Sequence, residues 1–156
     1  TLSGYYWMGG FGEVIDPAQA TIEAHMLPSI VELAHHNLEQ GTLSMRAARQ
    51  AGVRIALGSD RNGVSGDDTA LELLRMVHHG LTSAEALVSA TSIAAEAIGL
   101  QDHIGTITAG RLADIVVVDG DAVASPELLR DPQRIWLVLQ LGEVVGGAAL
   151  EATPPT

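Results

Sequence analysis

The sequence predicts an α/β protein whose last third is richer in strands than the rest. Up to about Leu100, apolar residues recur at helical spacing, interrupted by one short apolar run at Val53–Gly58. From about Ile104, β-branched residues gather in short runs between glycines, a pattern typical of strands. The order helix, strand, helix in the first part favours a parallel sheet covered by helices.

Composition narrows the class of protein. The chain has 156 residues, of which 47% are hydrophobic, and a net charge of −11 with no lysine and eight arginines. A folded core is therefore expected, whereas a basic surface for nucleic acid or anionic membrane is not. The absence of cysteine excludes disulfides and thiolate metal sites, and it is compatible with a cytoplasmic location. The first residue is not methionine, so we expect part of a longer protein.

The first hundred residues begin with helices. Asp16-Pro17 has the residue types of a helix start, and Pro28 is expected to interrupt that helix. A second helix should end at Gly41, and a third, short helix should run from Thr42 to Gly52.

Asp60 follows the apolar run Val53–Gly58 after one intervening residue, Ser59, and the run has the composition of a strand buried on both faces. An Asp at this place often only forms a turn. In one large class of α/β enzymes, however, the residue at the carboxyl end of a strand takes part in the chemistry. Arg61 and Asn62 come next and are candidates for substrate contact in the loop.

Three further helices are predicted after this loop. The first begins after Asp67-Asp68, carries an apolar stripe with i, i+3, i+4, i+7 spacing, and stops at Gly80. Thr82–Glu85 has the pattern of a capping box that starts the second, and Gly99 ends the third.

The carboxy-terminal part should contain Ile115–Val118 and Arg134–Gln140 as strands. A hairpin is predicted at Leu141–Val144, with Gly142 at the first central position of the turn. Asp114 precedes a strand, and we interpret it as a structural hydrogen-bond acceptor.

Three segments, in this order, resemble the carboxy-terminal portion of the amidohydrolase superfamily, in particular its imidazolonepropionase-like and dipeptidase-like hydrolases. They are Ala51–Asp60, His79–Leu100 and Ile104–Asp121. The resemblance implies the last strand or strands and helices of a (β/α)8 TIM-type barrel over residues 1–103. Residues 104–150 would then be part of a composite β-sandwich domain, and residues 151–156 a tail.

The resemblance also implies a function: hydrolysis of C–N bonds in amides, peptides or cyclic amides of small-molecule substrates by a metal-activated water. In the family, the residue that matches Asp60 binds a divalent metal, with one or two zinc ions expected, and accepts the proton of the water. Arg61 and Asn62 would then be candidates for binding the substrate.

The sequence departs from the family pattern in its metal ligands. It has no His-x-His pair and no lysine, and its histidines lack a spacing that would bring them to one metal. We therefore expect structural roles for all six histidines: His25, His35, His36, His78, His79 and His103. Of these, His78 and His79 fall at the carboxyl end of a predicted helix, where a cation would suit the helix dipole. Alone, the chain is expected to bind metal weakly and to be inactive.

A second hypothesis is a non-catalytic binding or assembly domain derived from the same fold. The reading frame upstream of Thr1 distinguishes the two, because a continuing frame that encodes His-x-His after an apolar strand favours the enzyme. If the chain is a fragment, apolar strand edges left without their partners should make the isolated chain aggregate or form homo-oligomers.

Overall fold

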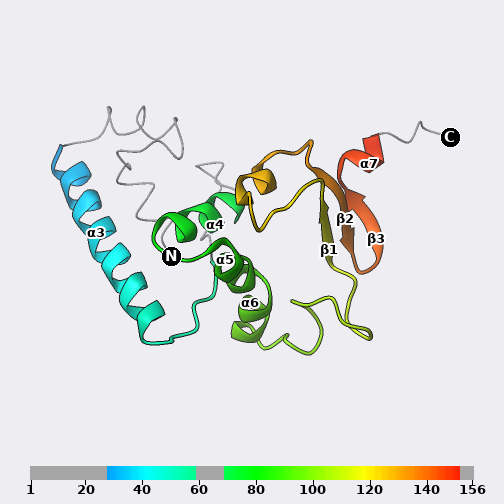
Figure 1. Ribbon diagram of the computed structural model, residues 1–156, viewed down its shortest axis with the longest axis horizontal. Coiled ribbons are helices and arrows are strands. Elements are labelled where there is room, and N and C mark those ends of the chain that lie inside the picture. The colour runs from blue at the N-terminus through cyan, green and yellow to red at the C-terminus, as the bar shows by residue number, and fades with distance from the viewer. Residues whose placement is uncertain (1–27, 59–68, 152–156) are drawn as a thin grey trace.

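The computed structural model describes residues 28–58 and 69–151. Helices come first and a three-stranded antiparallel sheet follows, with α3 at one end of the molecule, α4–α6 in the middle and the sheet at the other end (Figure 1). The elements are α3 (Pro28–Gln50), α4 (Thr69–His78), α5 (Ser83–Ala90), α6 (Ser92–Ala97), β1 (Ile115–Val118), the 3-10 helix η1 (Pro126–Arg130), β2 (Ile135–Gln140), β3 (Glu143–Gly146) and α7 (Ala148–Glu151). The helix expected at Asp16-Pro17 lies outside the described residues.

Helix α3 is continuous, so the predicted break at Gly41 is wrong. Glycine inside a helix costs only about 1 kcal/mol relative to alanine, and burial of Met45 in the core offsets that cost. The predicted end at Gly52 is confirmed. Gly52 has a φ of 72°, its N–H donates to the Arg49 carbonyl at 3.0 Å, and the Val53 N–H donates to the Ala48 carbonyl at 2.9 Å. These two bonds form a Schellman motif.

Residues 53–58 do not form the predicted β-strand. A strand needs a neighbouring strand to complete its hydrogen bonds, and the only sheet in the described residues is β1–β2–β3. The strand-like alternation is nevertheless present. Ile55 and Leu57 pack against the helical core, whereas Val53, Arg54 and Ala56 are exposed.

The core lies between α3, α4 and α5. It is formed by Met45, Leu73, Met76, Leu81 and Ala86. The predicted apolar stripe would bury one face of helix α4, but buried residues extend beyond that face.

Polar side chains on α4 are buried as well. Glu72 is 3% exposed and Arg75 is 1% exposed, and their charged groups lie 3.8 Å apart one helical turn from each other. Burial of two charges is tolerated when they are paired in this way.

The predicted capping box at the start of α5 is confirmed. The Thr82 side chain accepts the Glu85 N–H at 3.2 Å, and Glu85 accepts the Thr82 N–H at 2.7 Å. Arg49 of α3 also donates to Glu85, at 3.0 Å. The Thr82 backbone N–H, followed by the side chains of Arg49 and Thr82, lowers the pKa of Glu85 to about 2.

The hairpin between β2 and β3 forms as predicted, but its turn lies one residue earlier. Gln140 pairs with Glu143, so Leu141 and Gly142 are the two turn residues, with φ of 53° and 86°. Two positive φ values indicate a type I′ turn, in which Gly142 is second, not first. Asp114 accepts the Leu141 N–H at 2.7 Å, which confirms its interpretation as a structural acceptor.

Leu141→Asn is expected to raise the free energy of unfolding by about 0.5–1 kcal/mol, because asparagine tolerates the left-handed conformation that strains leucine. Thermal unfolding of the chain measures the change. Asp114→Ala removes the partner of the Leu141 N–H and should lower the melting temperature. An unchanged or lower melting temperature for Leu141→Asn would contradict the assigned turn.

His79 is buried at the end of α4. It is 2% exposed, and its Nδ1 lies 2.6 Å from the Thr42 hydroxyl of α3. Burial lowers the pKa of His79 to about 4, so the imidazole is neutral at pH 7. His79 therefore has the structural role expected for it, as a buried neutral side chain and not as a cation that matches the helix dipole.

Stability should fall as the pH is lowered from about 6.5 to about 4, because His79 must remain neutral in the fold while the unfolded chain takes up a proton. The shift corresponds to a loss of up to about 3 kcal/mol at 1.36 kcal/mol per pKa unit. Urea denaturation at several pH values measures it. His79→Gln, which does not titrate, should remove most of this pH dependence, and an unchanged pH profile in that variant would refute the assignment.

Candidate functional site

The three residues predicted from the sequence to form the site, Asp60, Arg61 and Asn62, lie outside the described residues. The structure describes the segment that leads to them, residues 53–58, which crosses from the end of α3 to the middle of the helical part (Figure 1). The described residues nearest to the predicted site are therefore those that hold this segment in place.

The segment is fixed at two points along its backbone. At its start, the Val53 N–H donates to the Ala48 carbonyl at 2.9 Å. Four residues later, the Leu57 N–H donates to the carbonyl of Ser89, near the end of α5, at 3.0 Å. Because the Leu57 side chain also packs on the core, the residue is held by both its amide and its side chain.

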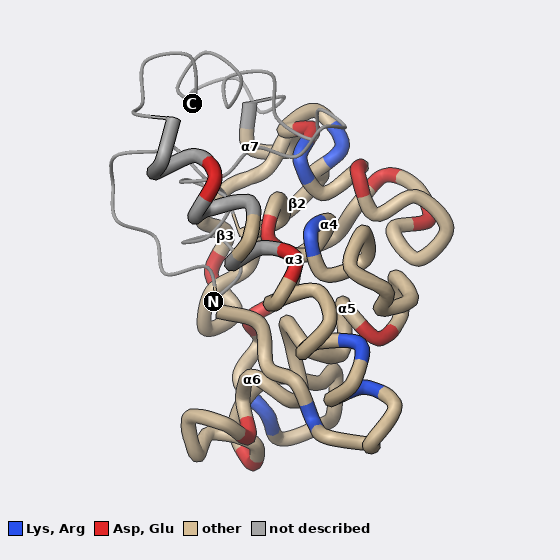
Figure 2. The backbone as a smooth tube through the Cα atoms, turned by 90° about the vertical axis from the view of Figure 1, so that its left-hand side faces the viewer, with Lys and Arg blue, Asp and Glu red and all other residues tan. Residues whose placement is uncertain are grey.

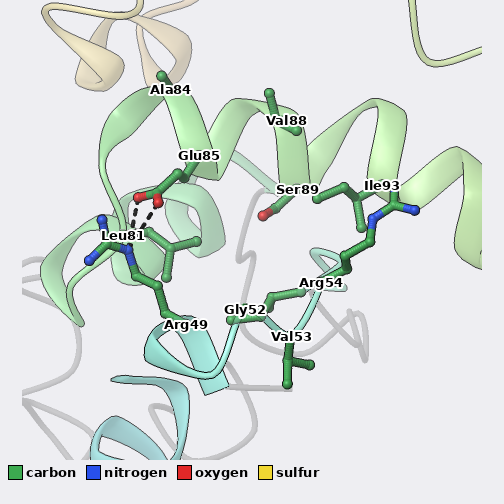
Figure 3. A pocket seen from close by; sticks show the side chains of 11 residues that line it. Arg49, Gly52, Val53, Arg54, Leu81, Ala84, Glu85, Val88, Ser89 and Ile93 are labelled. Atoms are coloured by element: carbon green, nitrogen blue, oxygen red, sulfur yellow. Dashed lines mark hydrogen bonds and ion pairs between the residues drawn. The ribbon is translucent and has the colours of Figure 1, made fainter. Parts of the chain in front are cut away.

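A groove of about 390 Å³ lies between the end of α3, the start of this segment and α5 (Figure 3). Its walls are mostly apolar, and its charged groups are paired. Arg49 binds Glu85 across one end, and Arg54 forms an ion pair with Glu96 of α6. The groove is lined by Arg49, Gly52, Val53, Arg54, Ile55, Leu81, Ala84, Glu85, Val88, Ser89 and Ile93.

This groove is poorly suited to acid–base chemistry. Glu85 is its one carboxylate, and a pKa of about 2 makes it a weak proton acceptor at neutral pH. Both oxygens of Glu85 already accept bonds from Arg49 and its own helix cap. The capping box and the ion pair thus give Glu85 a structural role.

A second cavity, of about 640 Å³, lies between the helices and the sheet. Leu73 and Leu87 line it from α4 and α5, and Val116 and Val138 line it from β1 and β2. Asp114 is the acidic residue in its wall, and it already accepts the Leu141 N–H. The cavity therefore offers apolar surface without a group placed for catalysis.

Metal ligands do not gather among the described residues. Within residues 28–58 and 69–151, no group of three or more His, Asp or Glu side chains is placed to hold a metal ion. A catalytic zinc centre commonly takes three protein ligands and a water. The described part of the chain therefore does not by itself supply such a set.

The distribution of charge and hydropathy bears on whether the described residues could bind nucleic acid or cross a membrane. Acidic and basic positions are dispersed along the described backbone (Figure 2), and several arginines are paired with carboxylates. In the part of the chain that the structure describes, no helix is both long and apolar enough to cross a membrane.

Comparison with known proteins identifies the family. A sequence model of the amidohydrolase family matches residues 12–145, a range that includes both the described core and Asp60. The chain belongs to the amidohydrolase family. This confirms the resemblance found in the three sequence segments.

Relatives of this amidohydrolase chain are longer than it is. It is 35% identical over 113 residues to the imidazolonepropionase of Shouchella clausii, a match that covers 69% of this chain and 25% of that protein. A prolidase solved in complex with N-methylphosphonate-L-proline is 32% identical, with a TM-score of 0.68 over 83% of this chain and 32% of that one. A putative prolidase from Bifidobacterium longum is 25% identical, with a TM-score of 0.77 over 92% and 33%. The chain thus spans about a quarter to a third of the length of these proteins.

Sequence reasoning missed the residues that hold the segment before Asp60. The Ser89 carbonyl belongs to a small polar residue within a helix, and nothing in its side chain signals the bond that it accepts. The buried pair of Glu72 and Arg75 was also missed, although its i, i+3 spacing is visible in the sequence.

Proposed function

We propose that this chain is part of a metal-dependent amidohydrolase that cleaves C–N bonds in amides, peptides or cyclic amides of small molecules. The observation that carries the proposal is the family match over residues 12–145, a range that contains Asp60 two residues after the segment 53–58. Relatives named imidazolonepropionase and prolidase support this class of substrate.

On this proposal, Asp60 lies at the carboxyl end of a barrel strand. The family match supports this placement, and so does the packing of Ile55 and Leu57, two residues apart, against the helical core, as one face of such a strand would pack. On this proposal, residues 1–103 belong to the barrel, residues 104–150 to a β-sandwich domain and residues 151–156 to a tail. The antiparallel sheet β1–β2–β3 is the described part of that second domain.

Asp60 is proposed as a metal ligand and as the acceptor of the proton of the attacking water. A divalent metal, with zinc as the expected ion, supplies the activation of that water at neutral pH. Asp60 holds the proton and delivers it to the leaving nitrogen. Arg61 and Asn62, next in the loop, are proposed to contact the substrate.

Asp60 would be one ligand of a larger set, because the described residues provide no cluster of ligands. The relatives are three to four times longer than the region they share with this chain, and their extra length leaves room for the others. This chain alone is therefore expected to bind zinc weakly and to hydrolyse nothing.

The test is a hydrolysis assay on a protein of full family length that contains this sequence. A panel of X-Pro dipeptides, simple N-acyl amino acids and a cyclic amide covers the proposed substrates. Activity should be lost after chelation and return on addition of zinc. Absence of hydrolysis across the panel by the zinc-loaded protein would favour the second hypothesis, a non-catalytic binding or assembly domain.

A further inference from the structure

We draw no further inference here: the strongest candidate, the apolar cavity of about 640 Å³ between helices α4 and α5 and strands β1 and β2, carries no proposal because nothing in the described residues shows what covers it.

Discussion

Asp60→Asn should reduce turnover of the full-length hydrolase by about 10²–10⁴-fold, the range for loss of a general base. Asparagine has the size and turn preference of aspartate, so the fold should be retained. It lacks the negative charge and does not accept the proton of the attacking water. Steady-state kinetics, with zinc content measured on the same samples, gives the result.

Asp119→Asn is a matched control for this experiment. Asp119 is an exposed carboxylate that pairs with Arg134 at 3.0 Å beyond the end of β1. Its loss should change neither turnover nor zinc content, because a surface ion pair contributes little. If Asp60→Asn also left turnover and zinc content unchanged, the role of Asp60 would be limited to forming a turn.

Arg75→Met should lower the free energy of unfolding by about 3–5 kcal/mol. Arg75 is 1% exposed, and its removal leaves the carboxylate of Glu72 buried without this cation. A loss of this size is a large part of the stability of a small domain. Urea denaturation followed by circular dichroism measures the change.

The double variant Glu72→Leu/Arg75→Met tests the cause. Removal of both charges also removes the cost of burying the Glu72 carboxylate without the Arg75 cation, so much of the lost stability should return. A double variant no more stable than Arg75→Met alone would show that Arg75 stabilises the fold by its packing and not by its charge.

Features set by local chemistry were predictable from the sequence. The capping box of Thr82 and Glu85 and the helix end at Gly52 depend on a few neighbouring residues, and both form as expected. Asp114 was also assigned correctly, because an Asp before a strand favours a structural acceptor. In these cases the physical cause lies within a few residues of the effect.

Features that depend on distant partners were not predictable in the same way. Residues 53–58 have the composition of a strand, but a strand also requires a neighbour that the sequence of the segment does not specify. Gly41 was expected to break α3, and the burial of Met45 outweighs that local preference. The burial of His79 against Thr42 is likewise a tertiary event, and it keeps His79 neutral although a cation would suit its place at the end of the helix.

The candidate site also has one part that the sequence predicts and one part that depends on the fold. Asp60 was found from its place after an apolar run and from the resemblance to a family. The bond from the Leu57 N–H to the Ser89 carbonyl joins positions 32 residues apart through backbone atoms, which every sequence has in common. Such a bond becomes visible only when the fold brings the two segments together.

The most direct test of the account is a crystal structure of the zinc-loaded full-length hydrolase, with zinc located by anomalous scattering. We predict an oxygen of the Asp60 carboxylate at about 2.0–2.2 Å from a zinc ion. A zinc ion bound elsewhere, with the Asp60 carboxylate outside coordination distance and bonded only to neighbouring backbone N–H groups, would contradict the central claim.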